Sequence, residues 1–314
     1  SGGNYSECAI HTGLRLRYLI PMNPLISVVI PSFNRLKYIP SAIESAFQCG
    51  LENLEVIVVD DGSTDGSLDY LSNLSEQGKI CLMTHKDNKN LGQAASINLG
   101  LSEAQGEFIA ILDSDDFFSK EKFASQVSYL QENPDVGMVY GQGHAIDEDG
   151  HFLFEVPADG HQEDSDPNKL LLDCYMALPG GSLIRRSVFD KVGLFEEGFR
   201  AGQDHDMALR IMESTKVAYL PRLAFFYRKH GDSISVNGLR RRWMTGQEIL
   251  RRAAVRYPYK RSTIRKRKAV LNFRLGQTFW SESSKLTALR HFFVAGALDP
   301  VRAFKVFLGR EPLR

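Results

Sequence analysis

Carboxylates cluster directly behind a short apolar run in the middle of the chain. The run Phe108–Ile111 has the length and composition of a buried strand, and the string LDSDD that follows supplies Asp113, Asp115 and Asp116. A strand that ends in carboxylates delivers them to the edge of its sheet, where ligands bind. Two carboxylates separated by one residue can hold a hard divalent cation against the oxygens of a diphosphate. Because acidic loops also serve as turns and helix caps, this string alone leaves both interpretations open.

The elements that would position these carboxylates follow an alternating pattern. Residues 25–31, 54–60 and 79–85 are near-continuous apolar runs that predict strands, and each is followed by a polar loop and then by apolar residues at helical spacing. Alternating strands and helices predict a parallel sheet with helices on both faces. One edge of that sheet would collect the loops that contain Asn34, Asp61, Asn90 and Asp113.

The same stretch carries an ordered series of motifs. Between about residues 25 and 236 the chain contains, in this order, SVVIPSFNR, VIVVDDGSTDGS, NLGQAASINLG, LDSDD, GQDHDMALRI and YRKHGDSIS. Together they resemble the successive motifs of family 2 glycosyltransferases with the GT-A nucleotide-sugar-binding fold. The resemblance implies an α/β protein with a Rossmann-like, mainly parallel sheet flanked by helices. It also implies metal-dependent, inverting transfer of a sugar from a nucleotide sugar, with UDP the expected nucleotide, to an acceptor hydroxyl in cell-surface glycan or glycolipid synthesis.

The resemblance assigns the nucleotide base and ribose to the loop after the first strand and to the DDGS loop. A carboxylate can accept the imide N–H of uracil, which suits Asp61, and a loop aromatic can cover the ring. For Asp65 we prefer capping of the next helix. Amides at the helix start after NLGQ could face an anion, although many such helices bind nothing. The donor-binding residues predicted in these loops are Pro31, Phe33, Asn34, Arg35, Asp61, Gly92 and Gln93.

Matching LDSDD to the family pattern predicts a metal site beside the donor. The pattern assigns Asp113 and Ser114 to the donor and Asp115 to the cation, and leaves Asp116 a structural role. In YRKHGDSIS it places His230 and a downstream serine over the diphosphate. Imidazole is a suitable ligand for Mn2+ or Mg2+ when carboxylates and phosphates complete the shell. Since most isolated histidines are surface or hydrogen-bonded core residues, the His230 assignment depends on the accompanying motifs.

The motif GQDHDMALRI supplies the predicted catalytic base. The family usually carries a glutamate and an aspartate here, whereas this chain has Gln203 before Asp204. Inverting transfer needs one carboxylate to take the proton of the attacking hydroxyl, and we predict that Asp204 does so. Asp206 belongs instead to the first turn of a helix, where it favours the helix dipole. Paired carboxylates Asp113 and Asp204 would also suit a glycoside hydrolase, but that reaction requires no nucleotide pocket.

The segment from about residue 178 to 199 resembles the acceptor side of the family's site. Gly180, Gly181 and Ser182 could permit close approach of the acceptor or the donor sugar. A turn that requires glycine explains them equally well.

Composition favours a cytoplasmic protein with reduced cysteines. The chain of 314 residues is 43% hydrophobic and 24% charged, which suits one large domain with an appendage. Its apolar runs fall short of the about 20 residues that a membrane span needs, and no secretory leader is visible. Four cysteines, Cys8, Cys49, Cys81 and Cys174, lack metal-ligand spacing, so neither zinc nor disulfides are expected.

The net charge of zero conceals an uneven layout. Residues 236–314 hold 19 Lys and Arg against four acids, which leaves 19 against 34 upstream because the whole chain holds 38 of each. This tail predicts several basic helices broken at Pro258 and Pro300. They could bind an anionic membrane surface on the inner face of the cell membrane, pack on the rest of the protein, or, less in keeping with the acidic upstream part, bind nucleic acid. Its aromatic residues include Trp243, Phe273, Trp280, Phe292, Phe293, Phe304 and Phe307.

We therefore expect three regions: an N-terminal extension over residues 1–24, a GT-A glycosyltransferase domain over 25–236 and a basic helical region over 237–314. The extension shows no clear period, and Met22 could be an alternative start. The main rival enzyme is a sugar-nucleotide nucleotidyltransferase, but its LxGGxGTR-like loop is missing after the first strand. A non-catalytic nucleotide-sugar or glycan-binding relative is the third hypothesis.

Overall fold

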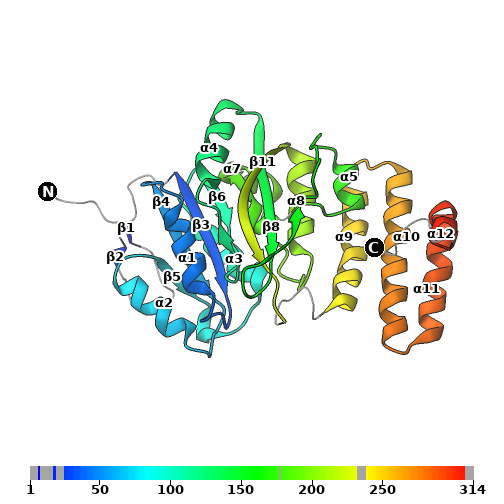
Figure 1. The fold of residues 1–314 in the computed structure, drawn as a ribbon, viewed down its shortest axis with the longest axis horizontal. Coiled ribbons are helices and arrows are strands. Elements are labelled where there is room, and N and C mark those ends of the chain that lie inside the picture. The colour runs from blue at the N-terminus through cyan, green and yellow to red at the C-terminus, as the bar shows by residue number, and fades with distance from the viewer. Residues whose placement is uncertain (1–5, 8–16, 19–24, 177, 232–237, 308–314) are drawn as a thin grey trace. The chain divides into compact units, whose positions relative to one another are not determined.

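The computed structural model describes residues 6–7, 17–18, 25–176, 178–231 and 238–307 (Figure 1). The chain divides into two compact units. The first contains the described residues up to Ser165 together with Tyr175–Gly198 and Gln203–His230. The second contains Asp166–Cys174, Phe199–Gly202 and the described residues from Gly231 onward.

A nine-stranded mixed sheet organises the first unit. The strand order is β5-β4-β3-β6-β10-β8-β11-β7, and β9 pairs with β8. Neighbours β5, β4, β3 and β6 are mutually parallel, as are β8 and β11, whereas β10 runs antiparallel to both β6 and β8. The α/β class and the mainly parallel sheet are thus confirmed. The strands are β3 Ile26–Ser32, β4 Leu54–Asp60, β5 Cys81–Thr84, β6 Phe108–Ile111, β7 Phe117–Phe118, β8 Val136–Ile146, β9 Phe152–Val156, β10 Ser182–Arg185 and β11 Lys216–Arg228.

Helices flank this sheet (Figure 1). Every residue of β3 and β4 is buried, which explains why their sequences are apolar without alternation. Helix α1 buries Ile39, Ala42 and Ile43 in the core that these strands share, so its apolar stripe is its packing face. The helices of this unit are α1 Ile39–Gln48, α2 Ser67–Glu76, η1 Lys86–Asn88, α3 Gln93–Glu103, α4 Lys122–Glu132, α6 Leu178–Gly181, α7 Arg186–Val192 and α8 Gln203–Ser214.

The register of the parallel strands brings the polar loops to one edge. Ser32 of β3 pairs with Asp60 of β4, so Asn34 and Asp61 leave the sheet at the same level. Val29 pairs with Ile111 of β6, the last strand residue before Asp113. The expected collection of loops at the carboxyl edge is therefore present.

Two features of the N-terminal part differ from expectation. Strands β1, Ser6–Glu7, and β2, Arg17–Tyr18, pair antiparallel in a region without a sequence period. Cys81, at the start of β5, is disulfide-bonded, so the expectation that disulfides have no role is wrong for this cysteine. Sequence spacing could not reveal the bond, because pairing depends on distances in space.

The second unit is helical, as its sequence predicts. It consists of α5 Pro167–Leu172, α9 Leu239–Arg256, α10 Arg261–Ser281, α11 Lys285–Leu298 and α12 Pro300–Phe307. Close packing of α10 on α11 depends on Gly276, where an added Cβ would lie 2.6 Å from the Phe292 ring. The buried Arg267 of α10 donates to the Leu172 carbonyl of α5 at 3.0 Å. Within the described residues, no helix has the length and apolarity to cross a membrane.

Candidate active site

Arg35, Asp115 and His230 form a hydrogen-bonded cluster although they come from distant parts of the chain. Asp115 Oδ2 accepts from Arg35 Nε at 3.2 Å and contacts His230 Nε2 at 2.9 Å. The His230 ring is buried and stacks on Tyr38, with 5.0 Å between the ring centroids. The structure therefore brings together the two residues predicted to hold the cation. The downstream serine of that motif lies outside the described residues.

A second chain of hydrogen bonds lies at the starts of two helices. Gln93, the first residue of α3, donates from Nε2 to Asp113 Oδ1 at 2.5 Å. Gln203, the first residue of α8, donates from Nε2 to Gln93 Oε1 at 2.6 Å. Asp204 follows Gln203 in the first turn of α8, and its charge acts on Asp113. The predicted base and the predicted donor carboxylate are thus neighbours.

This carboxylate cluster alters proton affinities. Burial and, to a lesser extent, the nearby charges of Asp115 and Asp204 raise the pKa of Asp113 to about 7, while Gln93 and Arg35 oppose the shift. Burial also raises the pKa of Asp116, whose Oδ1 accepts from the Arg228 amide at 2.9 Å. Asp116 is 2% exposed and links the LDSDD loop to β11, in keeping with the structural role predicted for it.

The loop after β3 is fastened to the DDGS loop by side chains of both. Asn34 has the left-handed φ of 52°, its amide donates to Ser63 Oγ at 2.9 Å, and its Oδ1 accepts from the Thr64 amide at 2.8 Å. Phe33 beside it is exposed, whereas Pro31 is buried within β3. An exposed ring held on a fixed loop can cover a flat ligand.

Asp61 has a positional role that sequence reasoning missed. It is buried, and its carboxylate accepts from the amides of Leu91 at 2.7 Å and Gly92 at 2.9 Å. His85 Nε2 lies 3.4 Å from Asp61 Oδ1. Asp61 therefore ties the DDGS loop to the loop before α3. Because these partners are about 30 residues apart in sequence, no local pattern predicts the contact.

The three residues predicted on the acceptor side are all buried. An added Cβ at Gly180 would lie 2.2 Å from the Phe225 ring, so a side chain there has no room. Helix α4 binds the neighbouring carbonyls, since Gln126 Nε2 donates to Gly181 at 2.8 Å and Lys122 Nζ to Ser182 at 3.0 Å. These contacts favour the packing interpretation of the glycines.

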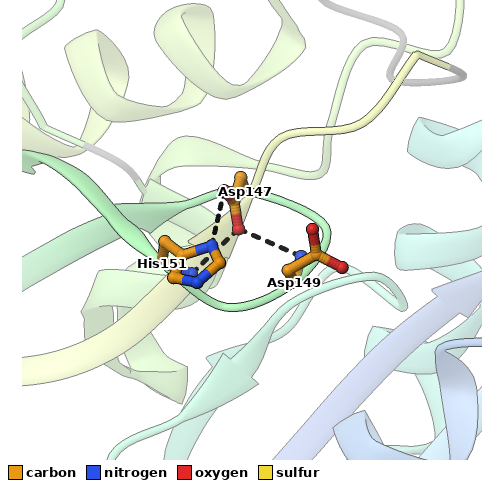
Figure 2. Close-up of side chains that lie close together, drawn as sticks. All are labelled: Asp147, Asp149 and His151. Atoms are coloured by element: carbon orange, nitrogen blue, oxygen red, sulfur yellow. Dashed lines mark hydrogen bonds and ion pairs between the residues drawn. The ribbon is translucent and has the colours of Figure 1, made fainter.

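A further group of potential metal ligands is separate in sequence from the predicted ones. Asp147, Asp149 and His151 occupy the exposed turn between β8 and β9, with ligand atoms within 4.8 Å of one another (Figure 2). Asp147 Oδ1 accepts from the amides of Asp149 at 3.0 Å and His151 at 2.8 Å, and its Oδ2 lies 3.0 Å from His151 Nδ1. These local bonds account for the turn, and the group carries no assignment.

The residues at the strand edge fit a divalent cation. Ligand atoms at right angles in an octahedral site with bonds of about 2.1 Å lie about 3 Å apart. Asp115 Oδ2 and His230 Nε2 are separated by 2.9 Å, which matches two adjacent positions of such a site. One carboxylate oxygen and one imidazole nitrogen suit Mn2+ or Mg2+ once phosphate oxygens supply further ligands.

Comparison with known proteins identifies the family. The family model described as "Glycosyl transferase family 2" matches residues 27–193. The chain is similar to glycosyltransferase GlyG of Streptococcus pneumoniae, with 31% identity over 68% of this chain and 73% of that protein. The chain belongs to glycosyltransferase family 2. It is therefore a glycosyltransferase, of class EC 2.4. An uncharacterized glycosyltransferase of Rickettsia felis is 33% identical over 68% of this chain, which spans only 36% of that longer protein.

Solved structures of similar fold agree with this assignment. S. aureus TarS 1–349, in complex with UDP-GlcNAc, superposes with a TM-score of 0.67, at 18% identity over 87% of this chain and 80% of that one. The mannosyltransferase PcManGT from Pyrobaculum calidifontis, in complex with GDP-Man and Mn2+, gives a TM-score of 0.58 at 18% identity over 91% of this chain and 79% of that one. At these identities the likeness shows the GT-A fold.

Proposed function

We propose that this glycosyltransferase moves a sugar from a UDP-linked donor to an acceptor hydroxyl with inversion, using Mn2+ or Mg2+. The observation that carries the proposal is the Arg35–Asp115–His230 cluster next to Asp113 and Asp204. The UDP-GlcNAc bound by TarS and the Mn2+ bound by PcManGT support the nucleotide and the cation.

Each residue of the cluster has a distinct task in this proposal. Asp115 and His230 would hold the cation, which would stabilise the negative charge of the departing diphosphate. Arg35 donates to Asp115 and so restrains that carboxylate between its own guanidinium group and the His230 ring. It also adds positive charge. Asp113 and Ser114 contact the donor, while the loops of Pro31, Phe33 and Asn34 and of Asp61 hold the nucleotide.

Asp204 is the proposed base. It takes the proton from the acceptor hydroxyl while that oxygen attacks the anomeric carbon from the face opposite the leaving group, which inverts the centre. Its place in the first turn of α8 puts it near the positive end of the helix dipole. A single carboxylate suffices, because the nucleotide leaves without protonation by a second acid.

We further propose that the acceptor is a glycan or lipid-linked sugar, reached by a peripheral protein on an anionic membrane. The basic tail supports this, since α11 exposes Leu286 and Phe293, which lie two helical turns apart on one face. The exposed cations Lys285 and Arg290 lie on the same helix. Apolar side chains flanked by cations bind anionic lipid through both contributions.

The experiment that tests the reaction is a screen followed by turnover. Candidate nucleotide sugars are tested for stabilisation of the protein against heat with and without Mn2+, because a ligand that binds the folded state raises its melting temperature. The best donor is then incubated with the enzyme, and released UDP is measured. Release of UDP that requires the cation and Asp204 supports the proposal, whereas binding without turnover supports a lectin-like relative.

A further inference from the structure

Two amide side chains connect the donor carboxylate to the helix that carries the base. The bridge runs from Asp113 through Gln93 to Gln203, with 2.5 and 2.6 Å between the bonded atoms. Gln93 begins α3 and Gln203 begins α8, so the bridge joins two helix starts that are 110 residues apart in sequence. Gln203 is 9% exposed, which removes most competition from water.

The bridge has a fixed direction. Asp113 Oδ1 accepts from Gln93 Nε2, which sets the orientation of the Gln93 amide. The remaining Gln93 oxygen then requires a donor, and Gln203 Nε2 supplies it. The Oε1 atom of Gln203 has no hydrogen-bond partner among the described residues, so its donating nitrogen alone holds the amide in place. Position 203 must therefore carry a donor.

A glutamate at position 203 would break this arrangement. Its carboxylate cannot donate to Gln93 Oε1, and turning the Gln93 amide around would set an oxygen against Asp113. It would also add a negative charge beside Asp113, which already interacts with the charges of Asp115 and Asp204. A glutamate at 203 would thus leave Gln93 Oε1 without the donor that Gln203 supplies in this chain.

We propose that Gln93 and Gln203 are positioning residues that lock the first turn of α8 to Asp113 and so hold the Asp204 carboxylate at the reacting hydroxyl. The inference deepens the proposed function and rests on it for the role of Asp204. It identifies the departure at position 203 as one half of a matched pair whose other half is Gln93.

The test is Gln203→Glu, alone and together with Gln93→Lys, measured with the UDP-sugar selected above. A lysine at 93 can donate to both Asp113 and a glutamate at 203, so it supplies the donors that the glutamine pair provided. We expect Q203E to lower kcat by about 10- to 100-fold, because small misplacements of a reacting group cost this much. The KM for the donor changes by less than about 3-fold, since Gln203 itself is not one of the proposed donor-binding residues. The double variant recovers most of the lost kcat.

Two controls and a second readout keep the result unambiguous. Q93K alone reports any direct effect of the new cation, and Gln131→Glu adds the same charge at an exposed site on α4. Retention of wild-type kcat by Q203E, or a double variant no faster than Q203E, would overturn the bridge. Melting temperatures of the wild type, Q203E, Q93K and the double variant should show the same rescue, and this measurement requires no turnover. Wild-type protein that releases no UDP would instead overturn the proposed function, and the melting data would still decide the bridge.

Discussion

At the scale of single residues, proximity of like charges distinguishes this site. Burial, together with the nearby charges of Asp115 and Asp204, raises the pKa of Asp113 to about 7, and shifts of this kind cluster at functional sites. The positive charge of Arg35 partly neutralises the cluster, and the Gln93 side-chain amide donates a hydrogen bond to Asp113. A bound cation would neutralise it further and so reduce the repulsion among these carboxylates.

Replacement of the proposed base should stop transfer but not binding. Asp204→Asn removes the proton acceptor while keeping the shape, so we expect kcat to fall by about 10²- to 10⁴-fold, the range of general base catalysis. The affinity for UDP, measured by calorimetry, should change little.

Asp206→Asn is the matched control in the same helical turn. It weakens the bond to Arg210 at 2.9 Å and should lower the melting temperature while preserving turnover. Full activity of the Asp204 variant would place the base elsewhere.

His230, one of the two proposed cation ligands, gives a second test at this scale. His230→Ala removes a ligand 2.9 Å from Asp115, so we expect the affinity for the nucleotide sugar in the presence of Mn2+ to fall by at least about 10-fold. Affinity without Mn2+ should change far less. Titration of donor into both proteins, each with metal and with chelator, measures the difference. Equal metal dependence in the variant and the wild type would remove His230 from the site.

At the scale of elements, the sequence predicts those strands and helices that a local residue pattern encodes. The runs that form β3, β4 and β6, and the helices that follow them, are visible because full burial demands continuous apolar strands. The insertion of β10 between β6 and β8 is not visible, since strand order depends on contacts far apart in sequence. The clamp of Asp61 on Gly92 and the Gln93–Gln203 bridge escape prediction for the same reason. The residue types at strand ends indicate a functional site, whereas the hydrogen bonds among those residues can be identified only in the folded structure.

Helix α4 contains a buried lysine whose titration should influence stability. Lys122 Nζ lies 5.0 Å from the centroid of the Phe118 ring and donates to the Ser182 carbonyl. Burial lowers its pKa from 10.5 to about 7. Between these values the unfolded chain binds more protons than the folded one, so the free energy of unfolding rises as pH increases.

Lys122→Met tests this dependence. In the wild type, urea denaturation should give greater stability at about pH 8.5 than at about pH 7.5, and the variant should lose most of this increase. Measurements stay below about pH 9 because burial raises the pKa of the nearby Cys49 to about 11, and that thiol then acts in the opposite direction. If the free energy of unfolding depends equally on pH in both proteins, Lys122 remains charged in the folded protein.

At the scale of the whole molecule, opposite charges are segregated along the chain. The tail from residue 236 carries 19 Lys and Arg against four acids, while the upstream part holds 19 against 34. Within the second unit, buried contacts such as Gly276 with Phe292 use only part of its aromatic surface. Large apolar side chains of α11 and α12 stay exposed, including Leu286, Phe293, Val301 and Phe304. A surface that combines cations with exposed apolar groups suits an anionic membrane.

Liposome flotation tests this surface with matched variants. Wild-type protein should float with vesicles that contain phosphatidylserine and should not float with neutral vesicles, because each basic residue near an anionic surface contributes about 1 kcal/mol. Leu286→Ser with Phe293→Ser removes two side chains that are 86% and 78% exposed, and should reduce flotation several-fold without lowering the melting temperature. Val255→Ser is the control, since Val255 is 84% exposed on α9 outside the α11 stripe. If flotation is absent for the wild type, or if the Val255 variant loses as much as the α11 variant, the tail serves another purpose and the acceptor need not be bound to a membrane.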